Sequence, residues 1–123
     1  MGTKPVQQGD IAPDFTLPTQ KGEAFHLKDL IGTAAIILYF YPKDNTAGCT
    51  AEACSFRDQY EVFKEAGAEV IGVSSDSEES HQRFASKHHL PFLLLSDKSG
   101  KVRKLFGVPS TLGILPGRVT YVI

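Results

Sequence analysis

The chain has 123 residues, of which 41% are hydrophobic and 22% are charged. This length and composition fit a single globular domain with a modest core, which we expect to span residues 1–123. A formal net charge of −1 and the lack of a basic run argue against a nucleic-acid partner. The longest apolar run is too short to cross a bilayer, so we expect no membrane partner.

The first half of the chain predicts a hairpin, a strand and a helix. Residues 14–18 and 24–27 alternate around a loop that contains glycine, which is typical of a β-hairpin. Residues 34–41 are continuously apolar and predict a strand that is buried on both faces. Apolar residues then recur at intervals of three and four, which predicts one helix over about residues 46–66, ended by Gly67.

The second half continues the alternation. Strands are predicted at residues 69–74, 92–96 and 119–123, and helices at 77–88 and 102–106. This order favours an α/β fold with a central, largely parallel sheet flanked by helices. The last strand stops at Ile123 with no turn or polar tail, so we expect a domain truncated at its C-terminus that exposes a sheet edge.

The two cysteines of the chain, Cys49 and Cys54, follow the point where the apolar strand gives way to the long helix. The N-terminus of a helix presents unpaired N–H groups and partial positive charge, and both favour a thiolate. Polar neighbours of Cys49 indicate a turn and not a core face. The pattern therefore favours a redox-active thiol at Cys49, and the alternative is a buried core cysteine.

Two residues ahead of Cys49 suit the same chemistry. Thr46 places a hydroxyl where it can bond a thiolate and a bound oxygen species, and it is also a typical helix N-cap. Pro42 fixes the backbone at the exit of the strand and can shield the thiolate from water. Its simpler role is to terminate the strand.

Pro42, Thr46 and Cys49 together reproduce the Pro-x-x-x-Thr-x-x-Cys signature of peroxiredoxins. Residues 48–58 closely resemble the Q-type subgroup, also called bacterioferritin comigratory proteins. The resemblance extends to residues 9–15, 67–74 and 115–118, and so covers nearly the whole chain. It implies a thioredoxin fold in its peroxiredoxin variant, and a thiol peroxidase in which Cys49 is peroxidatic and Cys54 resolving.

The resemblance also assigns a role to Arg118. The family has an arginine just ahead of the last visible strand, beside the peroxidatic sulfur, where a cation stabilises the thiolate and donates hydrogen bonds to the peroxide. Without the family pattern Arg118 would be interpreted as a solvated loop residue. Arg57 is equally consistent with a salt bridge and with a role in the site, and Glu52 is expected to brace the start of the helix.

Helix geometry constrains any bond between the cysteines. Residues five apart on an ideal helix have Cα atoms about 8.6 Å apart, whereas a disulfide needs less than about 7 Å. If Cys49 and Cys54 pair, the first turns of the helix must unwind. The alternative for Cys54 is a core cysteine of an intact helix.

The reaction that the resemblance implies needs no metal, haem or flavin. The Cys49 thiolate attacks hydrogen peroxide or an organic hydroperoxide and becomes a sulfenic acid. Cys54 condenses with it to a disulfide, which thioredoxin or a similar dithiol protein reduces. The four histidines are scattered, and none lies near the cysteines in sequence, so a zinc site is not expected.

Two alternatives remain at this stage. One is a general thiol-disulfide oxidoreductase, which the lack of a Cys-x-x-Cys motif disfavours. The other is a redox-regulated binding protein without catalytic activity. We expect a monomer in the cytoplasm of a bacterium or cyanobacterium, and the alternative compartment is a plastid after removal of a transit peptide.

Overall fold

A four-stranded sheet forms the centre of the molecule. The structure is a computed structural model, and it describes residues 11–108, 110–111, 115–116 and 119–123. The sheet has the order β5–β4–β3–β8. Its strands are β3 (Ala35–Phe40), β4 (Ala68–Ser74), β5 (Leu93–Ser96) and β8 (Val119–Val122). The first three are parallel and β8 runs antiparallel to β3, which confirms the predicted central sheet, mixed but largely parallel.

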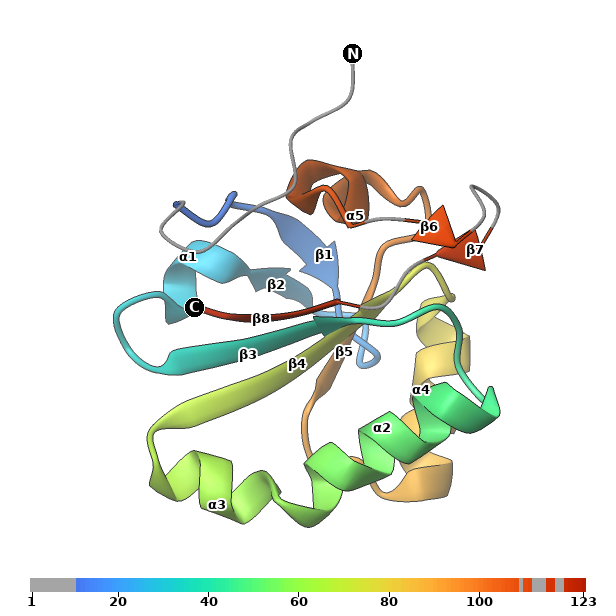
Figure 1. The fold of residues 1–123 in the computed structure, drawn as a ribbon, viewed down its shortest axis with the longest axis horizontal. Helices are drawn as coiled ribbons and strands as arrows, with labels where there is room; N and C mark the ends of the chain where they lie inside the picture. Colours follow the sequence, from blue (N-terminus) through green and yellow to red (C-terminus); the bar gives the residue numbers. More distant parts are fainter. Residues whose placement is uncertain (1–10, 109, 112–114, 117–118) are drawn as a thin grey trace.

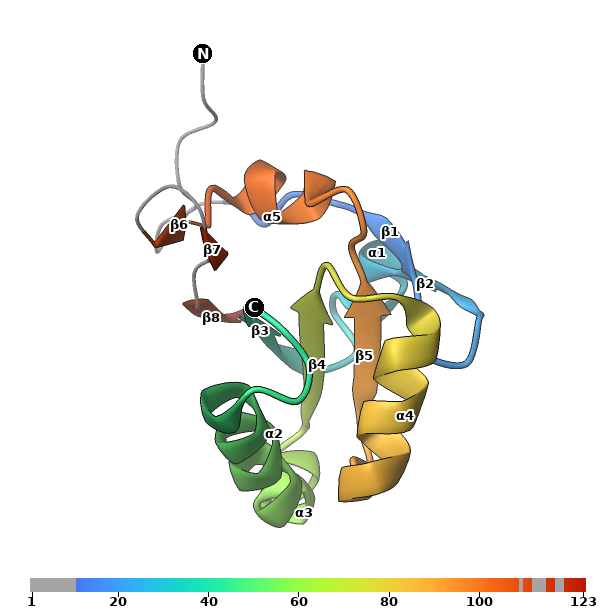
Figure 2. The same ribbon diagram turned by 90° about the vertical axis from the view of Figure 1, so that its right-hand side faces the viewer.

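Helices cover both faces of this sheet (Figures 1 and 2). One face carries α2 (Ala47–Asp58), α3 (Tyr60–Glu65) and α4 (Glu78–His88). The other face carries α1 (Leu27–Leu30), α5 (Lys101–Phe106) and the hairpin of β1 (Thr16–Pro18) and β2 (Ala24–His26). A separate antiparallel pair is formed by β6 (Ser110–Thr111) and β7 (Leu115–Pro116).

The side chains of β3 divide between two cores, because successive residues of a strand point to opposite faces. Leu38 and Phe40 pack into the core beneath α5. Tyr39 and Tyr41, on the face that α2 and α4 cover, share a second core with Cys49. The strand is therefore apolar throughout because both of its faces are buried, as predicted.

Gly72 allows Tyr39 to lie across the neighbouring strand. The two residues are partners in the register of β3 and β4. A Cβ atom added at Gly72 would lie 2.8 Å from Cζ of Tyr39 and 2.9 Å from Cδ2 of Leu94. Only glycine leaves room for the ring at this position.

The prediction of one long helix over residues 46–66 is wrong in one respect, because the segment forms two helices, α2 and α3. Helical geometry breaks at Gln59, where φ is −107° and ψ is 7°. Phe56 and Phe63 pack against the same core on either side of the break, so the apolar spacing continues across it. The four-residue helix α1 was not predicted, since so short a segment shows no periodicity.

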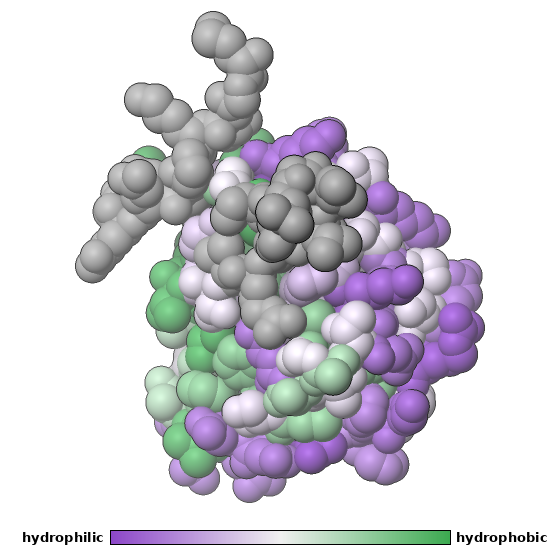
Figure 3. All heavy atoms as spheres, turned by 45° about the vertical axis from the view of Figure 1, so that its right-hand side comes forward, coloured by the Kyte–Doolittle hydropathy of each residue, from purple (hydrophilic) through white to green (hydrophobic). Residues whose placement is uncertain are grey.

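β8 lies at the edge of the sheet and pairs with β3 in the described part of the chain. Val122 of this strand is 77% exposed. Figure 3 shows a face on which hydrophobic residues gather on one side and hydrophilic residues on the other. β8 is thus an edge strand among the described residues, and truncation of the domain stays a prediction. Among the described residues, no helix has the length and apolar character needed to span a membrane.

Candidate active site

Cys49 lies in the first turn of α2. The N-cap of this helix is Thr46, whose hydroxyl accepts a hydrogen bond from the Cys49 N–H at 3.4 Å. The same hydroxyl donates to the carbonyl of Lys43 at 3.1 Å. Cys49 is only 1% exposed and belongs to the core between α2 and the sheet. The placement of this thiol at a capped helix N-terminus agrees with the sequence pattern. The expectation that Cys49 does not face the core was wrong, because the first turn of α2 packs this side chain against the sheet. Its catalytic role stays a prediction.

Cys54 lies further along the same helix and is half-buried. Both cysteines are thiols, with no disulfide between them. Because α2 is continuous from Ala47 to Asp58, the helix geometry that keeps the two residues too far apart to bond applies in this structure. The Sγ atom of Cys54 lies 4.0 Å from Nδ1 of His88, on α4.

Arg57 joins α2 to the end of α4. Its Nε donates to the Asp58 carboxylate at 2.9 Å, and its Nη1 donates to the carbonyl of His88 at 2.8 Å. The hydrogen bond to Asp58 is the main cause of a raised pKa for Arg57, and electrostatic interaction with the Cys54 side chain adds to it. Arg57 thus forms a salt bridge, and a role in the site stays a prediction.

Three further residues were singled out in the sequence, and the structure describes two of them, Pro42 and Glu52. Pro42 is half-buried and follows the end of β3, where a strand terminator belongs. Glu52 is half-buried on α2. Arg118 lies outside the described residues, so its position beside the sulfur stays a prediction.

A buried polar network connects the loop between β3 and α2 to α4. It was not predicted from the sequence. The Asp44 carboxylate accepts hydrogen bonds from the hydroxyl of Tyr41 at 2.7 Å and from that of Ser80 at 2.9 Å. Its Oδ2 also lies 2.7 Å from Nδ1 of His81, which is fully buried. On its other side, the His81 ring places Nε2 2.9 Å from the carbonyl of Leu95.

These contacts join the loop to α4. The Asp44 carboxylate has three side-chain hydrogen-bond partners, the hydroxyls of Tyr41 and Ser80 and the ring of His81. Both nitrogens of the His81 ring have a partner, the Asp44 carboxylate at Nδ1 and the Leu95 carbonyl at Nε2. The loop that leads to Thr46 is therefore attached to α4 by buried hydrogen bonds.

Asp76 completes the attachment of the loop. Its Oδ2 accepts a hydrogen bond from the backbone N–H of Asp44 at 2.7 Å and from the hydroxyl of Ser74 at 2.8 Å. The carboxylates of Asp44 and Asp76 and the ring of His81 offer ligand atoms within 4.8 Å of one another, close enough to surround a metal ion. Those atoms already form hydrogen bonds to protein groups, so we assign the group a structural role.

Tyr39, on β3, shares a core with Cys49. Burial raises its pKa well above the ordinary value, and the charges of Glu52, Asp44 and the two cysteines raise it further. The hydroxyl therefore stays neutral when a thiolate forms. Its oxygen is buried and has no hydrogen-bond partner among the described residues.

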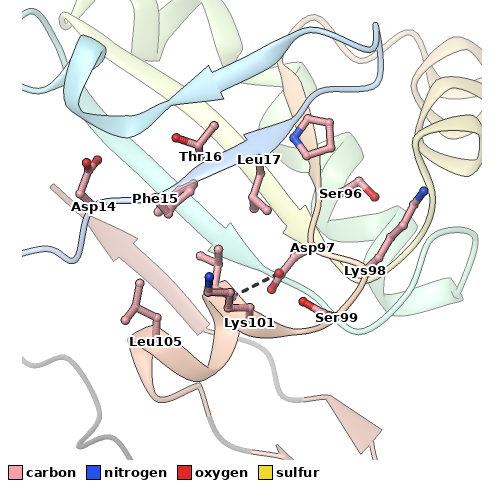
Figure 4. Close-up of a pocket in the computed structure, with 12 residues that line it drawn as sticks. Asp14, Phe15, Thr16, Leu17, Ser96, Asp97, Lys98, Ser99, Lys101 and Leu105 are labelled. Carbon is pink, nitrogen blue, oxygen red and sulfur yellow. Dashed lines mark hydrogen bonds between the residues drawn. The ribbon is translucent and has the colours of Figure 1, made fainter.

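A pocket of about 400 Å³ lies on the opposite face of the sheet, between β1 and α5 (Figure 4). Neither cysteine lines it. Asp97, at its rim, accepts hydrogen bonds from the backbone N–H groups of Val102 at 3.2 Å and Arg103 at 3.0 Å, and so caps α5. Cys49 and Cys54 are therefore separated from this pocket by the sheet.

Comparison with known proteins agrees with this geometry. Residues 8–123 match the AhpC/TSA family. The chain is 56% identical over 119 residues to the chloroplastic peroxiredoxin Q of Sedum lineare, covering 96% of this chain and 63% of that protein. It is 58% identical over 119 residues to the chloroplastic peroxiredoxin Q of Arabidopsis thaliana, covering 96% of this chain and 55% of that protein. The chain thus spans a little over half the length of these curated relatives.

A solved structure supports the same relationship. The crystal structure of peroxidoxin BcpB from Mycobacterium tuberculosis is similar to this one with a TM-score of 0.85 and 41% identity. The match covers 94% of this chain and 77% of that one. The expected thioredoxin fold is thereby confirmed, and the chain belongs to the AhpC/TSA family, within its peroxiredoxin Q subgroup.

Proposed function

We propose that this chain is a thiol peroxidase that reduces hydrogen peroxide and small organic hydroperoxides. The observation that carries the proposal is the position of Cys49 in the first turn of α2, behind a threonine N-cap and the loop that begins at Pro42. The unpaired N–H groups of that turn favour a thiolate, which is the nucleophilic form. Arg118, by family resemblance, supplies the cation that stabilises the charge on the leaving oxygen.

The catalytic cycle begins at Cys49. Its thiolate attacks one peroxide oxygen, the O–O bond breaks, and water or an alcohol leaves while the sulfur becomes a sulfenic acid. Cys49 is 1% exposed, so the substrate must be small or the exposed first turn of α2 must move to admit it. This limited access favours small hydroperoxides over bulky oxidants.

The second half of the cycle involves Cys54, as in an atypical two-cysteine peroxiredoxin. Its thiolate attacks the sulfenic sulfur, and an intramolecular disulfide forms with loss of water. The first turns of α2 unwind, because the intact helix keeps the two residues too far apart. Thioredoxin or a similar dithiol protein then reduces the disulfide. The names of the curated relatives favour a plastid over the cytoplasm.

Cysteine variants test this cycle. We expect Cys49→Ser to abolish peroxide turnover with thioredoxin and its reductase, since a serine hydroxyl is not ionised near neutral pH. Cys54→Ser should consume one peroxide per chain and then stop as a sulfenic acid that dimedone traps on Cys49. Turnover by Cys49→Ser above that of the Cys49→Ser/Cys54→Ser double variant would refute the assigned nucleophile.

A further inference from the structure

His88 is the ionisable residue of α4 that contacts Cys54. Its Nδ1 lies 4.0 Å from the Cys54 sulfur. Its ring packs edge-on against Phe84, with 5.1 Å between the ring centroids. Its carbonyl accepts the hydrogen bond from Arg57 at 2.8 Å. Contacts from α2 and from its own helix thus hold the imidazole beside the thiol.

We propose that His88 is a catalytic residue of the resolving step, in which its imidazole accepts the proton of the Cys54 thiol. The proposal rests on the proposed function, in which Cys54 attacks a sulfenic acid on Cys49. A neutral imidazole with its proton on Nε2 presents Nδ1 as an acceptor, and histidine is the side chain best suited to exchange protons near neutral pH. The thiolate that results is the form that attacks.

The step balances without another reagent. The proton moves from the Cys54 sulfur to Nδ1 of His88, and the thiolate then attacks the sulfur of the Cys49 sulfenic acid. The S–S bond forms as the S–O bond breaks, and the departing oxygen takes the proton from the imidazolium and leaves as water. Cys54 is oxidised and the sulfenic sulfur is reduced, so the histidine is regenerated.

The same contacts indicate which cysteine moves. Arg57 and His88 attach the Cys54 half of α2 to α4. The first turn of the helix contains the exposed residues Ala47 and Gly48, and its side-chain cap is the 3.4 Å bond to Thr46. The first turn therefore unwinds and carries Cys49 toward Cys54, which stays beside its base.

Other ionisable groups near Cys54 do not replace His88. Arg57, on the same helix, stays positively charged, and its pKa is raised mainly by Asp58. Tyr39, on β3, stays neutral because burial raises its pKa. Arg57 stabilises the thiolate at any pH near neutrality, whereas only the imidazole both accepts and returns a proton in that range.

The size of the effect follows from thiol ionisation. An ordinary cysteine has a pKa near 8.5 and is about 3% ionised at pH 7. Complete transfer of the proton therefore accelerates resolution at most about 30-fold, and the benefit disappears once hydroxide ionises the thiol. We expect removal of the imidazole to slow resolution about 3- to 30-fold at pH 7 and to have little effect at pH 9 and above.

The test uses His88→Phe, which keeps a ring against Phe84, and His88→Gln as a second variant in case the first folds poorly. His89→Asn is the matched control, because it removes the neighbouring exposed imidazole and asparagine tolerates the left-handed backbone there, where φ is 52°. Reduced protein is mixed with one equivalent of hydrogen peroxide. Dimedone-trapped sulfenic acid and disulfide are then followed by mass spectrometry between pH 6 and 9.5.

The expected result is slower disulfide formation in the His88 variants near pH 7, recovery at alkaline pH, and partial rescue by added imidazole. His89→Asn should behave as the unchanged protein. Equal rates and pH profiles in all proteins would overturn the role of His88, as would a slowing that is uniform across pH and unaffected by imidazole. Absence of a dimedone-trapped Cys49 sulfenic acid in Cys54→Ser would instead overturn the proposed function.

Discussion

The loop before α2 and the first turn of α2 adjoin in sequence, yet the structure holds them very differently. Asp44 in the loop is 4% exposed, and its carboxylate and backbone N–H form hydrogen bonds to four other side chains. The first turn has two exposed residues, Ala47 and Gly48, and its side-chain cap is the 3.4 Å bond to Thr46.

This difference agrees with the proposed cycle, in which Cys49 reacts with peroxide and then moves toward Cys54. A fixed loop keeps Pro42 and Thr46 in place, while glycine and threonine, which are weak helix formers, flank Cys49 and make its turn easy to unwind. Local opening of this kind requires far less free energy than global unfolding. The four predictions below test the contrast between the fixed loop and the weak turn.

Removing the hydrogen bonds that hold the loop before α2 should have the largest effect on stability. We expect Asp44→Ala to lower the free energy of unfolding by about 3–5 kcal/mol, because it leaves the buried His81 ring and the Tyr41 hydroxyl without their shared partner. Urea unfolding measures the loss. Asp58→Asn is the control, since it removes an exposed ion pair and should leave stability nearly unchanged. Similar small losses in both variants would mean that Asp44 does not hold the loop.

Formation of the disulfide should unfold the start of α2 and leave the sheet folded. We expect amide exchange from about residue 46 to 57 to accelerate roughly 100-fold when the disulfide forms, which corresponds to about 3 kcal/mol of lost local stability. Amides of β3 and β4 should stay protected. Cys54→Ser treated with peroxide is the control, because it cannot form the disulfide. Equal protection of α2 in the reduced and disulfide forms would refute intramolecular pairing and point to an external resolving thiol.

Two adjacent tyrosines of the same face should respond oppositely to loss of the hydroxyl. Tyr41→Phe removes a 2.7 Å hydrogen bond to the Asp44 carboxylate and should cost about 1.5–3 kcal/mol. Tyr39→Phe removes a buried hydroxyl with no hydrogen-bond partner among the described residues, so it should be neutral or slightly stabilising. Urea midpoints of the two variants measure the difference. A cost at Tyr39 equal to that at Tyr41 would contradict this.

The smallest expected effect is the contribution of Tyr39 and Tyr41 to the pH dependence of the free energy of unfolding. Their pKa values are raised well above the ordinary value of 10.0, chiefly by burial, so the folded state keeps a proton that the unfolded chain releases. Their contribution to stability is therefore complete below about pH 10 and is lost as pH rises further. Each should account for about 1.4 kcal/mol of the loss between pH 8 and 11. Tyr39→Phe should show a correspondingly smaller loss in urea unfolding, and an unchanged pH dependence would refute this assignment.

Sequence alone determined most of the elements and the position of Cys49 at the start of a helix. The alternation of strands and helices, the burial of β3 on both faces and the start of α2 near Cys49 are encoded by periodicity and by residues a few positions apart. The Thr46 cap is local in the same sense, because an N-cap bonds the backbone three residues later. The break at Gln59 was missed because the apolar spacing continues through it.

Only the tertiary structure decided which polar side chains meet. His81 reaches Asp44 across 37 residues, and His88 reaches Cys54 across 34. No spacing rule relates such pairs, since their distance depends on how α4 packs beside α2 on the sheet. Taken singly in the sequence, both histidines are ordinary residues of an amphipathic helix. Packing alone makes one the buried partner of the loop and brings the other within reach of the Cys54 sulfur.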